Sequence, residues 1–122
     1  MKFYKYLRTA QKLSFTANNE KQHIVVCAAF TRSGPILLTN GDKIHAEARA
    51  IRGLDNIQRI VVYRFNRADS TRGPRTSCPC LKCQGLILST GIKKVEYMTS
   101  LGPVVVTPIN IRSESTNWRY FK

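Results

Sequence analysis

The sequence predicts an α/β fold in a single domain spanning residues 1–122. Its length of 122 residues suits one hydrophobic core. Hydrophobic residues make up 43% of the chain and charged residues 22%, which is typical of a folded globular protein. Short β-branched apolar runs also alternate with segments in which apolar residues recur at helical spacing. Together these features predict strands and helices that alternate along the chain.

The first predicted element is an amphipathic helix over residues 2–13. Phe3, Leu7 and Ala10 fall on one stripe of this helix, and basic residues occupy much of the remaining surface. Residues 14–22 are polar and are expected to form a loop.

The next segments predict a β-hairpin. Residues 23–30 are apolar and β-branched, as in a buried strand, and residues 31–35 carry the glycine and proline of a turn. Residues 36–39 then return as the second strand. A third strand is expected over residues 57–65, after an intervening helix that begins near His45.

The last helix is predicted to begin at Pro79 and to end at Gly91, because proline suits a first helical turn and glycine a C-terminal cap. Residues 94–98 and 104–107 predict two final strands. The linker between them is too short for a parallel crossover, so these two strands are expected to be antiparallel. The predicted sheet therefore has five strands.

The charge of the chain favours a polyanionic partner. Twenty Lys and Arg residues against seven Asp and Glu give a net charge of +13, which suits nucleic acid or phosphorylated nucleotides. A basic protein with no such partner is the alternative. The N-terminal segment lacks an apolar signal core, and no apolar run approaches the length of a membrane span. We therefore expect a cytoplasmic protein.

The cysteine pattern points to metal rather than to disulfides. Three of the four cysteines, Cys78, Cys80 and Cys83, crowd into six residues, and Cys80 and Cys83 form a C-x-x-C pair. A catalytic zinc ion takes three protein ligands and keeps one open position. His45, Cys80 and Cys83 can supply those ligands, which leaves Glu47 beside the metal.

The pattern His45-x-Glu47 followed by Pro79-Cys80-x-x-Cys83 resembles the motif of the zinc-dependent cytidine deaminase-like superfamily. The resemblance implies a three-layer α/β/α sandwich with a five-stranded mixed sheet. It also implies Zn²⁺ as cofactor and Glu47 as the proton carrier in hydrolysis of cytosine to uracil. In this superfamily, free-nucleoside deaminases and many toxin-type polynucleotide deaminases have antiparallel last strands. The chain resembles that branch.

The resemblance further suggests residues that contact the substrate. Asn40 resembles an asparagine that contacts the sugar, although a simple turn residue is an equal alternative. The backbones of Ala46, Ser77 and Cys78 are expected to read the edge of the base. Trp118 and Phe121 could stack on a base or pack against the core.

Two questions stay open at this point. Single-stranded DNA or RNA is the favoured substrate, because Arg64, Arg67, Arg72 and Arg75 lie in or beside the loop leading into the metal motif. A free cytosine nucleoside or monophosphate is the first alternative. The second is a basic nucleic-acid-binding domain in which Cys78 supplies a fourth ligand and the zinc is purely structural.

Overall fold

The structure is a computed structural model, and it describes residues 1–111. The elements follow the predicted order of helix, hairpin, helix, strand, helix and two strands. The helices are α1 (Phe3–Phe15), α2 (Ala46–Gly53) and α3 (Leu81–Leu88); the strands are β1 (His23–Thr31), β2 (Gly34–Thr39), β3 (Arg59–Asn66), β4 (Lys94–Thr99) and β5 (Gly102–Val106); a 3₁₀ turn, η1 (Pro108–Asn110), follows. Trp118 and Phe121, which are predicted to stack on a base or pack against the core, lie outside the described residues.

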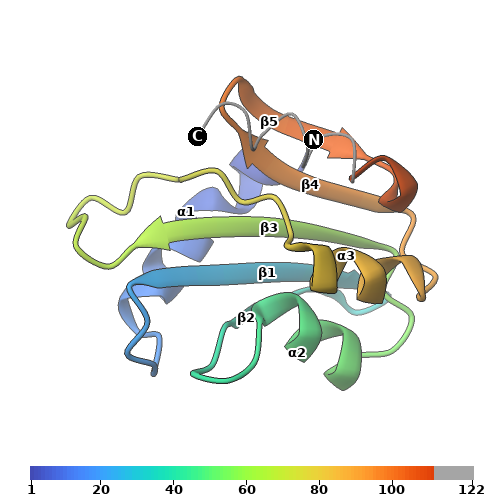
Figure 1. Ribbon diagram of the computed structural model, residues 1–122, viewed down its shortest axis with the longest axis horizontal. Coiled ribbons are helices and arrows are strands. Elements are labelled where there is room, and N and C mark those ends of the chain that lie inside the picture. Colours follow the sequence, from blue (N-terminus) through green and yellow to red (C-terminus); the bar gives the residue numbers. More distant parts are fainter. Residues whose placement is uncertain (112–122) are drawn as a thin grey trace.

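The five strands form one open, mixed sheet in the order β2-β1-β3-β4-β5 (Figure 1). Strand β1 is antiparallel to both β2 and β3, whereas β3 and β4 are parallel. The predicted antiparallel pairing of the last two strands is confirmed, with Val95 opposite Val106 and Thr99 opposite Gly102. The sheet is therefore mixed because β3 and β4, which α3 connects, are its one parallel pair of neighbouring strands.

Helices cover both faces of this sheet, with α1 behind it and α2 and α3 in front (Figure 1). The alternation of strand side chains divides the core into two parts. One part contains Cys27, Ala29, Ile60, Val62, Val95 and Tyr97, which pack with residues of α2 and α3. The other contains Val26, Ala28, Val61, Tyr63 and Phe65, which pack with residues of α1.

Two helix boundaries differ from the sequence prediction. Pro79 is not in the first turn of α3, because Cys80 is the N-cap and the helix begins at Leu81. The helix also ends before Gly91, since Ser89 is its C-cap residue and donates its backbone N–H to Gly85 and Ile87. Thr90 adds backbone and side-chain bonds to the Ile87 carbonyl, so the chain turns without needing glycine.

Helix α1 is fastened to the sheet by a buried carboxylate. Glu96 on β4 is completely buried, and its Oε1 accepts hydrogen bonds from the backbone N–H groups of Lys2 and Phe3, at 2.6 and 3.0 Å. Its Oε2 pairs with Arg59 on β3 at 2.8 Å. Glu96 thereby satisfies donors that the first turn of a helix leaves without intrahelical partners, and its negative charge suits the positive end of the helix.

A second buried contact holds the same end of α1. The Tyr63 hydroxyl donates to the Phe3 carbonyl at 2.7 Å, and the two rings lie 4.6 Å apart. Burial and the nearby Glu96 charge raise the pKa of Tyr63, so the hydroxyl keeps its proton and remains a donor. Within the described residues, none of the helices has the length and hydropathy needed to cross a bilayer.

We predict that Glu96→Ala lowers the free energy of unfolding by about 3 kcal/mol, because it leaves Arg59 and the start of α1 without their buried partner. Tyr63→Phe should cost about 1 kcal/mol, since it removes a single hydrogen bond. Denaturant unfolding measures both values. Glu20→Gln, which changes an exposed carboxylate, is the control and should stay within about 0.5 kcal/mol of the wild type. A Glu96→Ala protein as stable as this control would contradict the role of Glu96.

Candidate metal centre

The directions of the strands bring the two halves of the metal motif together. Because β2 and β3 are each antiparallel to β1, they run in the same direction and end at the same edge of the sheet. Helix α2 follows β2, and α3 follows β3, so both helices begin at that edge (Figure 1). His45 is the N-cap of α2 and Cys80 is the N-cap of α3.

His45, Cys80 and Cys83 form a compact group in which the possible ligand atoms all lie within 4.8 Å of one another. The Nδ1 atom of His45 lies 3.5 Å from the Cys80 Sγ and 3.3 Å from the Cys83 Sγ. A tetrahedral zinc ion with ordinary Zn–N and Zn–S bonds separates such atoms by about 3.6 Å. The donor set and its spacing therefore fit zinc with three protein ligands.

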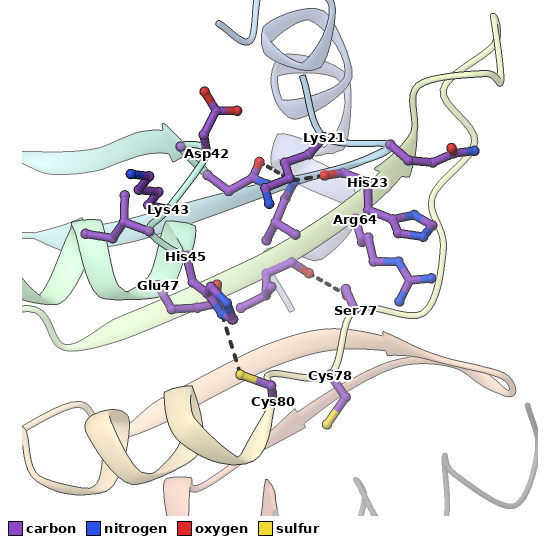
Figure 2. Close-up of a pocket in the computed structure, with 16 residues that line it drawn as sticks. Lys21, His23, Asp42, Lys43, His45, Glu47, Arg64, Ser77, Cys78 and Cys80 are labelled. Carbon is purple, nitrogen blue, oxygen red and sulfur yellow. Dashed lines mark hydrogen bonds between the residues drawn. The ribbon is translucent and has the colours of Figure 1, made fainter. Parts of the chain in front are cut away.

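Glu47 lies beside this group but is held differently. It is only 4% exposed, and Figure 2 shows its side chain next to His45 at the back of the cavity. Burial raises the pKa of Glu47, while its own backbone N–H, the nearby His45 and a hydrogen bond with Cys83 oppose that shift. A buried carboxylate that gains its proton easily is suited to proton transfer.

Burial also raises the pKa of the Cys83 thiol, and the neighbouring Glu47 and Cys80 add to this effect. The thiol is therefore protonated when no cation is present. A bound zinc ion reverses that balance, because coordination removes the proton from a thiol. Metal binding at this site should release protons.

Cys78 lies outside the ligand group. Its sulfur points away from His45 and Cys80 in Figure 2, and it packs against the core cluster beneath α2 and α3. Its Sγ lies 3.7 Å from the Pro79 carbonyl oxygen. The group of possible ligands thus has three members in the described chain, which leaves a fourth position for a non-protein ligand.

Several residues outside the motif brace it. The buried Gln84 side chain donates to the Pro79 carbonyl at 2.8 Å, and the Gln84 backbone N–H donates to the Cys80 carbonyl. On the other side of the site, Arg49 of α2 donates to the Thr39 carbonyl at the end of β2, at 2.6 Å. Sequence reasoning missed Gln84 and Arg49, because a glutamine or arginine on a helix gives no local sign of a buried bond to a loop.

A cavity of about 590 Å³ opens onto the metal group, a volume in the range of small-molecule sites. The cavity is basic: His23 and Arg64 lie on one side of His45, and Lys43 lies on the other (Figure 2). Burial and the neighbouring Arg75 lower the pKa of Arg64, whose buried Nε has no hydrogen-bond partner within residues 1–111.

The residues predicted to contact substrate fall into two groups. Asn40, Ser77 and Cys78 line the cavity, whereas Ala46 is buried at the start of α2. The Asn40 amide is bonded to strand β1, since it accepts from the Val25 N–H and donates to the His23 carbonyl. The Ser77 hydroxyl donates to the Val62 carbonyl and accepts from the Met98 N–H, so it ties the motif loop to β3 and β4.

Two of the four predicted phosphate-binding arginines have internal partners. Arg67 donates to the Lys21 and Asn19 carbonyls. Arg72 is only 6% exposed; it donates to the Ser14 hydroxyl and to several loop carbonyls, and it stacks 4.2 Å from the Phe15 ring. Both side chains therefore fix the loop between β3 and α3. Contact of any of the four with nucleic acid stays a prediction, and the geometry favours Arg64 and Arg75.

A scan of the sequence against known protein families gives no match, and no curated protein matches it significantly. The resemblance to the deaminase superfamily therefore depends on the motif and on the geometry of its three possible ligands.

We predict that Cys80→Ser and Cys83→Ser each lose bound zinc and lower the thermal midpoint, because each removes one of three ligands. Cys78→Ser is the matched control and should keep about one zinc per chain, because its sulfur lies outside the group. Elemental analysis of protein purified with zinc measures the stoichiometry. Zinc loss in Cys78→Ser would instead indicate a fourth protein ligand.

Proposed function

We propose that this protein is a zinc-dependent hydrolytic deaminase of the cytidine deaminase-like superfamily. Its proposed substrate is cytosine in single-stranded DNA or RNA, which it converts to uracil. The observation that carries the proposal is the His45, Cys80 and Cys83 group with the buried Glu47 beside it, at the floor of a basic cavity. The α/β sheet with helices on both faces supports the assignment, because it brings these residues to one edge.

The chemistry requires a nucleophile and a proton carrier. When bound, zinc supplies a nucleophile for hydrolysis near neutral pH, because it lowers the pKa of water to about 7. Glu47 would accept the proton released from the water and deliver it to the ring nitrogen next to the amino carbon. The water oxygen would bond to that carbon as a hydroxyl group. Glu47 would then carry the hydroxyl proton to the amino group, so that the carbon–nitrogen bond breaks, ammonia leaves and the uracil carbonyl forms.

The number of ligands separates this proposal from a structural zinc site. Structural zinc sites are closed by four protein ligands, whereas catalytic sites keep one position for water or substrate. The three-membered group leaves such a position, and the displacement of Cys78 from it supports the catalytic alternative. A structural site would also have no use for the buried carboxylate of Glu47.

We predict that Glu47→Gln abolishes deamination while it keeps about one zinc per chain, because Glu47 carries protons and is not a ligand. Asp42→Asn is the matched control: Asp42 lines the same cavity but is exposed, and within residues 1–111 its side chain accepts a single hydrogen bond, from the Glu20 N–H. This control should retain activity. Release of uracil from a cytosine-containing oligonucleotide measures the effect. Full activity in Glu47→Gln would overturn the catalytic proposal.

The charge on the cavity wall supports a phosphorylated substrate. Arg64 and Arg75 have adjacent backbones, joined by the Arg75 N–H and Arg64 carbonyl at 2.8 Å. Neither side chain has a hydrogen bond within residues 1–111; the Arg75 side chain is exposed, whereas the Nε of the half-buried Arg64 is enclosed by protein. Arginine binds phosphate oxygens through paired donors. A free cytosine monophosphate would use the same two residues, which is why substrates must be compared directly.

We predict that Arg64→Gln with Arg75→Gln lowers turnover of an oligonucleotide more than turnover of cytidine, because a nucleoside has no phosphate to lose. The ratio of the two kcat/KM values should fall at least tenfold, or about 1.4 kcal/mol. The exposed Arg32 in the β1–β2 turn provides the control Arg32→Gln. Efficient turnover of cytidine or its monophosphate by the wild type, with oligonucleotides untouched at low salt, would overturn the polynucleotide assignment.

A further inference from the structure

A second cavity borders the metal group from the side of the helices. It has a volume of about 390 Å³ and lies between α2 and α3. His45 and Cys83 form part of its wall, so the proposed metal lies between this cavity and the first. The two cavities also share Lys43 and Ile44. The two cavities are therefore adjacent at the start of α2, and the second forms a depression between α2 and α3.

The second cavity is lined by cations without counter-ions. Lys43, Arg52 and Lys82 contribute to its wall, and all three are exposed. None of their side chains has a hydrogen bond or ion pair in the described part of the chain, where the single ion pair is Arg59–Glu96. No Asp or Glu side chain among those residues lines this cavity. The three cations thus concentrate positive potential in a concave site, where it is screened less than on a flat surface.

We propose that the depression between α2 and α3 binds the backbone phosphates of a single strand whose cytosine occupies the first cavity. This inference rests on the proposed deaminase function, and it defines the substrate as a polynucleotide. A single nucleotide carries its phosphate beside its own sugar, so it cannot fill both cavities. A strand that passes over Lys43 can place its target base by Glu47 and a flanking phosphate between Arg52 and Lys82.

The proposed phosphate site lies on a different side of His45 from Arg64 and Arg75. Arg64 and Arg75 lie on the β3 side of His45, whereas Arg52 and Lys82 lie on the side of the helices. Figure 2 shows Lys43 and Arg64 on opposite sides of His45. Phosphates on both flanks of the target base would thereby be neutralised, which a free nucleoside or monophosphate does not require.

The test is the salt dependence of strand binding. The probe is a fluorescently labelled single-stranded DNA with one central cytosine, and anisotropy measures its Kd on zinc-loaded protein over a range of salt concentrations. In the variant Arg52→Gln with Lys82→Gln, the slope of log affinity against log salt should flatten by about 0.7 for each phosphate that the protein no longer neutralises. The control Arg8→Gln with Lys12→Gln removes the same charge from exposed positions on α1, on the opposite face of the sheet.

Each outcome decides one of the two proposals. A flatter slope in the Arg52 and Lys82 variant alone supports the phosphate site, whether or not uracil is formed. Equal slopes in both variants would mean that net charge alone attracts the strand, and would overturn the phosphate site even if the wild type deaminates cytosine. Absence of uracil from every substrate, with the slope still dependent on Arg52 and Lys82, would overturn the deaminase and leave a nucleic-acid-binding groove. Zinc content and thermal midpoint verify that both variants fold.

Discussion

The direction of β1 determines where the chemistry of this protein can occur. Since β1 pairs antiparallel with strands on both of its sides, β2 and β3 must run in the same direction. Each is followed by a helix, so the two helices begin at one edge of the sheet, and their N-caps are His45 and Cys80. His45 and Cys80 are 35 residues apart in sequence, and the order of the strands brings the starts of their two helices together. The metal group is a consequence of the sheet topology.

The two buried carboxylates of the described chain, Glu96 and Glu47, have different surroundings. The surroundings of Glu96 suit a structural role, and those of Glu47 suit proton transfer. Glu96 is matched by Arg59 and by two backbone N–H groups, so its charge is neutralised within the fold. Glu47 is equally secluded, but its nearest cationic or metal-binding neighbours are His45 and Cys83 of the ligand group. A buried carboxylate without a dedicated cation is costly to keep unless a metal or substrate compensates it. Burial accordingly raises the pKa of Glu47, so its neutral form is favoured until a cation is bound beside it.

The sequence was informative where the determining interactions are local. Short β-branched apolar runs located the five strands, and the short linker between β4 and β5 indicated their antiparallel pairing. The C-x-x-C spacing identified the ligand group for the same reason, since Cys80 and Cys83 are one helical turn apart. The anchor of α1 was not predictable, because Glu96 meets Lys2 across 94 positions of sequence. Gly91 likewise suggested the end of the last helix, but the helix ends earlier. Hydrogen bonds from the Ser89 backbone and the Thr90 hydroxyl cap it there.

The arginines show why charge density alone is a poor guide to a phosphate site. Arg72 comes from the most arginine-rich part of the chain, yet its donors are taken by a hydroxyl and by loop carbonyls that would otherwise be unsatisfied. A buried arginine in a loop commonly donates its hydrogen bonds to backbone oxygens. Only cations with unused donors can bind an external anion. Such cations also occur away from the site, on α1 for example, but five border it: Arg64 and the adjacent Arg75 on the β3 side of His45, and Lys43, Arg52 and Lys82 on the side of the helices. The proposed preference for a strand over a single nucleotide therefore rests on where these side chains lie, rather than on the net charge of +13.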